Sequence, residues 1–387
     1  MSPDDTLNEI YTRFILIGGS HILHMAYNSK GSNGGLKHMD HLDAKPDWSP
    51  WYRGWKLIMN PRGVGCPWET PNMWPGLRYT WEARTFTSSI SKTTTTTPTP
   101  SYKDRKPPSS NTANPPRLFK QSRWAGVATR IGYFTLHFVL LSLAYEFLSP
   151  EVLFGISPIN PSTDYTRAKE GMLRRLILQL FQGSSAQPLP VTKRELQIRA
   201  FLALEYVTGD FLLLSLYTDF FAICWLTLHL DEPWEFPPFY GNILEAYSMR
   251  HFWGKFWHRV IYRSFNAHAA IISRYVLRLR QRTQVTRVVN GLLVFGLSAV
   301  MHALVSVRLG NRCAWGRSMW YWMWQPVAFV LEDFVQGVWG KCRGRVAGWI
   351  GARGVKVLER GVGYVWVMSW LVWEAPKREF ALANCEA

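Results

Sequence analysis

Long apolar stretches alternate with charged segments along this chain, and several are long enough to cross a lipid bilayer. The clearest is Val288–Val307, which has 20 residues without a formal charge. A helix of that length spans about 30 Å of hydrocarbon. Ile131–Leu148 is nearly as apolar, with Glu146 close to its end. Phe201–Leu230 carries three acidic residues, so only about Phe211–Leu230 is expected to span.

Two later stretches and one early stretch are weaker candidates. Val355–Trp373 is less apolar at its start and strongly aromatic at its end, and Ser318–Trp339 contains two acidic residues. We expect Pro326 to kink the latter, which a membrane helix tolerates when neighbours satisfy the freed carbonyl. Tyr11–Tyr27 is either a weak first span or a surface helix. The pattern predicts an all-α integral membrane protein with several spans.

Composition and charge agree with a membrane location. Aromatic residues make up 15% of the chain, with 20 tryptophans, and the formal net charge is +17. Tryptophan and tyrosine concentrate at bilayer interfaces, and basic loops flank membrane helices on the cytoplasmic side. Five arginines within Arg274–Arg287 precede the strongest span and three within Arg308–Arg317 follow it, which places the former in the cytoplasm. The basic residues flank apolar spans and form no soluble patch, so we expect the lipid bilayer as a partner and no nucleic acid.

The chain divides into three parts. Residues 1–86 hold the weak first helix and the motif RGWKLIMNPRGVG, and residues 117–387 hold the predicted spans. Between them, residues 87–116 are rich in Thr, Ser and Pro and are predicted to form a disordered loop. The five cysteines are scattered and never in CxxC spacing, which argues against a disulfide framework or a zinc site. We therefore expect no metal.

His302 is the first candidate for chemistry, because it lies deep inside the strongest span. An ionisable side chain in hydrocarbon is costly and usually faces a cavity or the interior of a bundle. A neutral imidazole there would be a good general base, since burial disfavours its charged form. The alternative is a histidine that only bonds a neighbouring helix.

The stretch RHFWGKFWHRV, Arg250–Val260, interleaves basic and aromatic side chains. On a helix it would have one polar face and one aromatic face. The predicted faces are His251, Lys255, His258 and Tyr262 on one side, and Trp253, Trp257 and Val260 on the other. Such a helix would either point polar groups at the mouth of a cavity or anchor the chain among lipid headgroups.

This stretch resembles the signature of the membrane-bound O-acyltransferases, which reads Phe, an aromatic, three residues, Trp, then Asn or His. Phe252, Trp253, Trp257 and His258 match it, and His302 follows 44 residues later, as in the family pattern. The form of the stretch is similar to the wax synthase-like branch. The motif RGWKLIMNPRGVG, Arg53–Gly65, resembles a segment of fungal members, many of which acetylate terpenoid and meroterpenoid products.

The resemblance implies a polytopic helical bundle that encloses a reaction chamber, in the endoplasmic reticulum. It implies transfer of an acyl group, most simply acetyl, from acyl-CoA as co-substrate to a hydrophobic alcohol, with no tightly bound cofactor. His302 would be the base, and His258 would orient the reactants or donate a hydrogen bond to the carbonyl oxygen. Further residues expected to contact CoA or the alcohol are Trp257, Arg250, Lys255, Arg259 and Ser298.

Other functions stay open at this point. A long-chain wax ester synthase is the nearest alternative. A transporter or a non-catalytic membrane protein would account for ionisable residues within the spans, but it does not predict the signature. A metal-dependent oxygenase needs clustered histidines, and the 10 here include only short pairs such as His21 with His24. No oligomeric state follows from the sequence.

Overall fold

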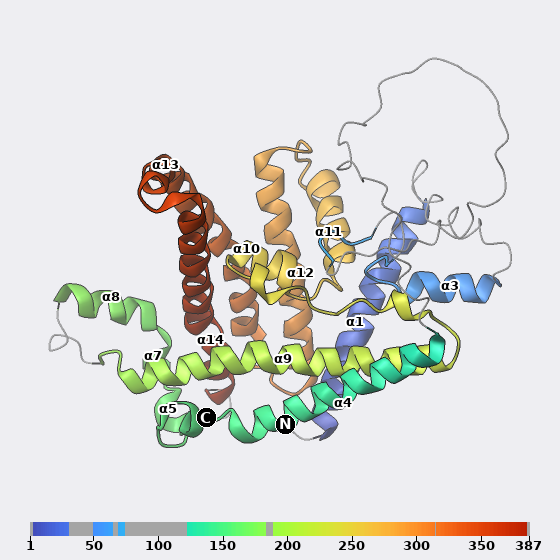
Figure 1. Cartoon of the computed structure of the whole chain (residues 1–387), viewed down its shortest axis with the longest axis horizontal. Helices are drawn as coiled ribbons and strands as arrows, with labels where there is room; N and C mark the ends of the chain where they lie inside the picture. Colours follow the sequence, from blue (N-terminus) through green and yellow to red (C-terminus); the bar gives the residue numbers. More distant parts are fainter. Residues whose placement is uncertain are drawn as a thin grey trace, which may run out of the picture.

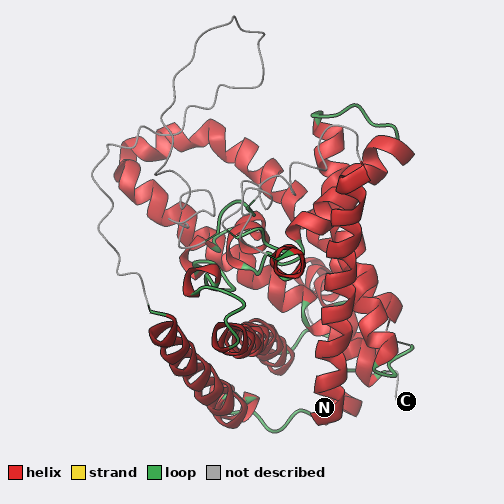
Figure 2. Ribbon diagram, turned by 90° about the vertical axis from the view of Figure 1, so that its right-hand side faces the viewer, coloured by secondary structure: helices red, strands yellow, loops and turns green. Residues whose placement is uncertain are grey.

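The computed structural model describes residues 3–30, 49–64, 69–73, 122–182, 189–313 and 315–384, with side-chain detail in the first range from residue 8 to residue 27. Across these ranges every regular element is a helix, as Figure 2 shows. The predicted all-α class is therefore confirmed. The predicted disordered loop, residues 87–116, lies outside the described residues, as does Gly65 at the end of the N-terminal motif.

The helices differ widely in length. In chain order they are α1 (Pro3–Lys30), α3 (Pro50–Ile58), α4 (Arg123–Phe147), α5 (Pro150–Phe154), α6 (Pro161–Asp164), α7 (Arg167–Glu170), α8 (Met172–Gln182), α9 (Lys193–Thr227), η3 (Pro233–Glu235), η4 (Ile243–Glu245), α10 (Met249–His251), η5 (Phe252–Phe256), α11 (Tyr262–Ile271), η6 (Ile272–Val276), α12 (Gln284–Arg308), α13 (Trp315–Glu374) and α14 (Pro376–Ala383).

Three helices are long and apolar enough to cross a membrane: α4, α9 and α12. They contain the three clearest predicted spans, although α9 ends at Thr227, three residues before the predicted end of its span. The other predicted spans are also helical, but α1 and α13 fall outside this set of three. The structure therefore supports a membrane protein whose best candidate spans are these three helices.

Helix α13 contains both of the weaker late spans, and it folds back on itself at Gly351. The backbone of Gly351 has φ 72° and ψ 163°, a conformation that suits a residue without a Cβ. Across this break the indole of Trp339 donates a hydrogen bond to Glu359 over 2.7 Å, and Arg343 pairs with the same carboxylate over 2.7 Å. The break lies at Gly351, whereas the expected site, Pro326, lies within helical backbone.

Helices α4 and α9 lie side by side along the lower part of the molecule in Figure 1. The carboxylate of Asp219 on α9 holds them together, because it is 2.7 Å from Arg130 and 2.8 Å from His137, both on α4. Asp219 is 2% exposed, so this charge lies within the protein and is compensated by two partners.

Helix α1 packs against α11 and α12, which come much later in the chain. The ring of His268 on α11 bonds the Ser20 carbonyl over 3.1 Å, and the ring of His21 bonds the Leu57 carbonyl over 2.9 Å. His21 is buried. The predicted early helix thus packs against the bundle through one face, while Tyr11, Ile15 and Leu23 are exposed on another.

The cysteines add one departure from expectation. Cys224 and Cys342 are free, whereas Cys313 is disulfide-bonded. Pairing depends on the distance between two Cα atoms in the fold, and scattered positions in the sequence carry no information on that distance.

Candidate active site

The stretch RHFWGKFWHRV is not the amphipathic helix that its spacing predicted. It forms one α-helical turn, α10, then the π-helical turn η5, and at Trp257 the backbone becomes extended with ψ 150°. His258 therefore lies in irregular backbone, and it does not share a helix face with His251 and Lys255.

Contacts from distant parts of the chain impose this shape. The carboxylate of Glu332 on α13 accepts hydrogen bonds from the amides of Met249 and Arg250, the second over 3.2 Å. The amide of Trp257 donates to the Phe252 carbonyl over 2.7 Å, which closes the π-helical turn. Gly241 donates to the Phe256 carbonyl over 2.8 Å and approaches so closely that a Cβ there would lie 1.9 Å from the Lys255 oxygen. None of these partners could be identified from local periodicity.

The aromatic side chains of the stretch lie in the protein core. Phe252, Phe256 and Trp257 are 2%, 2% and 4% exposed. Trp257 stacks on Tyr206 of α9 with ring centroids 5.6 Å apart, and the indole of Trp253 donates to Gln325 of α13 over 3.3 Å. The alternative of an anchor among lipid headgroups is therefore wrong for these rings, since protein surrounds them.

The motif RGWKLIMNPRGVG forms α3 and a tight loop. The Asn60 side chain accepts from the Val64 amide over 2.7 Å and donates to the Val64 carbonyl over 2.9 Å, while Gly63 adopts a positive φ of 65°. Arg62 donates to the carbonyls of Pro238 and Pro237 over 2.9 and 3.1 Å. These contacts hold the loop beside the segment that leads to His258.

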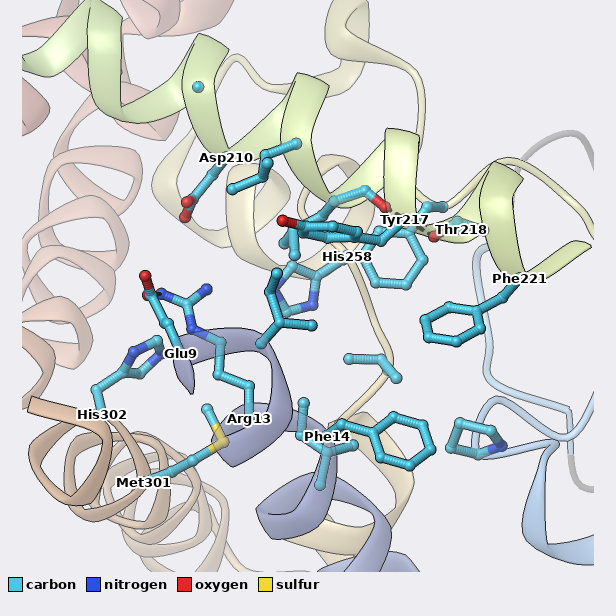
Figure 3. A pocket seen from close by; sticks show the side chains of 18 of the residues that line it. Glu9, Arg13, Phe14, Asp210, Tyr217, Thr218, Phe221, His258, Met301 and His302 are labelled. Carbon is cyan, nitrogen blue, oxygen red and sulfur yellow. Dashed lines mark hydrogen bonds and ion pairs between the residues drawn. The ribbon is translucent and has the colours of Figure 1, made fainter. Parts of the chain in front are cut away.

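A cavity of about 1090 Å³ lies within the bundle, and both predicted catalytic histidines line it. Figure 3 shows His302, from α12, and His258 on either side of this space, with α1 below and α9 above. Residues from α14 and from the Asn60–Val64 loop also line it. The two histidines, 44 residues apart in sequence, thus face one chamber.

The two imidazoles are held by stacking. The ring of His302 stacks on Trp322, and the ring of His258 stacks on Phe239 with centroids 5.3 Å apart. Neither ring forms a hydrogen bond with any of the described residues, and the Nδ1 atom of His258 is buried. Burial, together with the positive charges of Arg13 and Arg62, lowers the pKa of His258 to about 3, so this imidazole is neutral at pH 7.

The other predicted contact residues lie outside the cavity lining. Arg250 pairs with Asp333 over 2.8 Å on the surface, and Lys255 pairs with Glu245 over 2.9 Å. The buried guanidinium of Arg259 donates to the carbonyls of Pro71 and Gly254.

Trp257 and Ser298 are both buried, the first in the aromatic core and the second in α12 about one helical turn before His302. The predicted set of basic groups for CoA is thus engaged in contacts within the protein.

Charged residues that the sequence analysis did not select line the cavity instead. They are Glu9 and Arg13 on α1, Arg62 in the loop after α3, Glu205 and Asp210 on α9, Glu235 in η3, and Arg378 and Glu379 on α14. Arg378 lies over the ring of Tyr206, 5.1 Å from its centroid. A signal for the first pair was present, because Glu9 and Arg13 are four residues apart at the start of an apolar stretch, where charge is costly.

The opposite part of the cavity is apolar. Phe14 of α1 stacks on Phe221 of α9 with centroids 6.1 Å apart, and Phe221 lies 4.7 Å from the Trp225 ring. All three line the cavity, and Figure 3 shows Phe14 and Phe221 away from His302. The chamber can therefore accept a molecule with a hydrophobic body and a polar end directed at the histidines.

Comparison with known proteins gives a consistent picture. Residues 236–325 match the membrane bound O-acyl transferase family. The acetyltransferase atnC of an Arthrinium species is 28% identical over 235 residues, which are 60% of this chain and 50% of that protein. The acetyltransferase nanB of Aspergillus nanangensis is 33% identical over 147 residues, 38% of this chain and 34% of that protein.

A third relative, the acetyltransferase TRI7 of Fusarium sporotrichioides, is 31% identical over 159 residues, 38% of this chain and 34% of that protein. The chain thus spans half or less of the length of these three curated relatives. No solved structure matches significantly. The matched segment runs from Phe236 to Gln325 and includes the signature stretch, His258 and His302. The predicted resemblance is confirmed, because this segment of the chain matches the membrane bound O-acyl transferase family.

Proposed function

We propose that this protein is a membrane O-acyltransferase that moves an acetyl group from acetyl-CoA to a hydroxyl group of a hydrophobic, terpenoid-type alcohol. The observation that carries the proposal is the shared cavity of His258 and His302, within a segment that matches the acyltransferase family. The names of the relatives as fungal acetyltransferases support acetyl as the group transferred.

The arrangement suits direct transfer in four steps. The alcohol lies with its hydrophobic body against Phe14 and Phe221 and its hydroxyl at His302. His302 accepts the hydroxyl proton as the oxygen attacks the thioester carbonyl. The tetrahedral intermediate then collapses, the carbon–sulfur bond breaks, and the protonated His302 returns its proton to the thiolate of CoA. General base catalysis of this kind contributes about 10² to 10⁴ in rate.

His258 has a supporting role in this mechanism. Its imidazole is neutral at pH 7 and carries one N–H group and one acceptor nitrogen. Because the ring is fixed by Phe239 and faces the same cavity, it can orient the acyl donor opposite His302. A fixed dipole near the reacting carbonyl aligns the reactants before the bond forms.

We place the protein in the endoplasmic reticulum membrane, with several spans. The alcohol reaches the cavity from the bilayer, and acyl-CoA arrives from the cytosol. Helices α4, α9 and α12 support the membrane location by length and composition. The cluster of arginines between η6 and α12 supports a cytosolic position for the start of α12.

The test is an acyl-transfer assay on membranes that contain either the wild type or His302→Ala. Labelled acetyl-CoA is supplied with a panel of hydroxylated terpenoids, and a parallel arm supplies a long-chain acyl-CoA with a fatty alcohol. We expect a labelled acetyl ester that disappears in the His302→Ala membranes. Ester formation only in the long-chain arm would overturn the acetyl assignment, and equal rates for both proteins would overturn the role of His302.

A further inference from the structure

Arg13 of α1 reaches into the space between the two histidines. Figure 3 shows its side chain extending from α1 with the guanidinium between His302 and His258, beside the carboxylate of Glu9. Arg13 lines the cavity, and its side chain is 18% exposed. The N-terminal helix thus brings a cation to the place where the acyl group and the alcohol would meet.

Most of the hydrogen-bonding capacity of Arg13 is unused. A guanidinium has five N–H donors. The Nη2 atom pairs with Glu9, and no other partner among the described residues accepts from this side chain. Its Nε atom is buried without an acceptor. Since a buried donor without a partner costs about 1–3 kcal/mol, the free N–H groups are suited to an acceptor that the substrate brings.

The positive charge of Arg13 affects the groups around it in the chamber. Burial has the largest effect on the pKa of His258 and lowers it. The charge of Arg13 lowers it further, by more than that of Arg62. The carboxylate of Asp210, on α9, faces Arg13 across the cavity in Figure 3 and forms no ion pair with any of the described residues. A fixed cation in a water-poor chamber stabilises negative charge that develops nearby far more than it would in bulk water.

We propose, on the basis of the function proposed above, that Arg13 is a further catalytic residue that stabilises the oxyanion of the transferred acyl group. When the alcohol oxygen bonds to the thioester carbon, the carbonyl π electrons move to its oxygen. The free N–H groups of Arg13 donate hydrogen bonds to this oxygen while His302 holds the proton of the alcohol. When the carbonyl forms again, the carbon–sulfur bond breaks and the thiolate takes that proton from His302.

Glu9 acts through Arg13 as a positioning residue. Its carboxylate lies one helical turn earlier on the same face of α1 and holds one end of the guanidinium. This leaves the other N–H groups of Arg13 without an acceptor among the described residues. The fixed geometry matters, because a donor contributes most when it is aligned before the charge develops.

The test compares Arg13→Gln and Arg13→Lys with the wild type in the same acyl-transfer assay. We expect Arg13→Gln to lower kcat by about 10² to 10³-fold, the usual effect of removing one oxyanion donor. The KM values for acetyl-CoA and alcohol should change by no more than about threefold, since the interaction forms only in the transition state. Arg13→Lys keeps the charge without the planar fork and should have an intermediate kcat. Glu9→Gln should show a smaller loss than Arg13→Gln.

Arg174→Gln is the matched control, because Arg174 is exposed on α8 and does not line the cavity. Thermal unfolding of each variant separates loss of catalysis from loss of folding, and Arg13→Lys serves if Arg13→Gln does not fold. An unchanged kcat in Arg13→Gln would overturn the inference, as would a raised KM for acetyl-CoA with an unchanged kcat. If His302→Ala abolishes transfer while Arg13→Gln does not, only this inference fails. If wild type and His302→Ala are equal, the proposed function fails.

Discussion

The imidazole of His302 lies flat against the indole of Trp322, with ring centroids 4.2 Å apart and ring planes at 11°. Trp322 is buried and comes from α13, whereas His302 comes from α12. This contact fixes the plane of the imidazole without using either ring nitrogen. In the proposed mechanism, this orientation by stacking would keep both nitrogens of His302 available to the reactants.

Replacing Trp322 should therefore affect the rate more than the binding of substrate. We expect Trp322→Leu to lower kcat by about tenfold or more, because a misoriented base loses much of its contribution to the rate. Trp322→Phe retains a flat ring and should stay within a few-fold of the wild type. Steady-state kinetics on purified protein would decide this, and equal kcat values for the two variants would contradict the role given to the stacking contact.

The buried His258 should make the protein less stable in acid. Its pKa falls from an ordinary 6.5 to about 3 on folding. Between these values the unfolded chain binds a proton that the folded chain does not, so stability decreases as the pH falls, by about 1.4 kcal/mol per pH unit. His258→Gln lacks this proton and should lose about 2 kcal/mol less than the wild type between pH 6.5 and pH 5. Thermal unfolding in detergent at several pH values measures the difference, and parallel curves for the two proteins would count against it.

The ion pairs of Asp219 should be important for stability. We expect Asp219→Asn to destabilise the fold by about 3 kcal/mol, because it leaves the charge of Arg130 without its partner inside the protein. The matched control is Asp333→Asn, whose pair with Arg250 is on the surface, with side chains 65% and 54% exposed. That change should cost no more than about 1 kcal/mol. Thermal unfolding of both variants is the measurement, and equal losses would refute the distinction.

Two glycines near the signature stretch should respond differently to alanine. A Cβ at Gly241 would overlap the Lys255 carbonyl oxygen, whereas a Cβ at Gly254 would have nothing within 4 Å. Gly241→Ala must displace the backbone that leads to His258, and we expect a large fall in both folded yield and activity. Gly254→Ala should be tolerated. Size-exclusion profiles and transfer rates of the two proteins provide the comparison, with a stable and active Gly241→Ala as the result that would disprove the expectation.

The sequence predicted the apolar helices well, because a bilayer demands about 20 apolar residues whatever surrounds them. Val288–Val307 and Ile131–Leu148 coincide closely with α12 and α4. The turn at Gly351 was not predicted. It lies between two weak spans in a segment rich in charge, where apolar length gives no signal.

The site was predicted in part. The spacing of His258 and His302 in the family pattern identified two residues that do line one cavity. The helical faces assigned to Arg250–Val260 were wrong. Two residues outside the stretch, Glu332 and Gly241, fix its backbone. The basic residues of the stretch were expected to contact CoA or the alcohol, because they are close in sequence to His258. The cations that line the chamber are Arg13, Arg62 and Arg378. They come from α1, from the loop after α3 and from α14, all far from the stretch in sequence.

This last feature has a consequence for biogenesis. The walls of the cavity include Arg13 of α1 and Arg378 of α14, so both histidines are synthesised before the wall that α14 contributes. Until α14 is made, the chamber is open where Arg378 and Glu379 later lie. The cavity that His258 and His302 share is therefore completed only when α14 has been added.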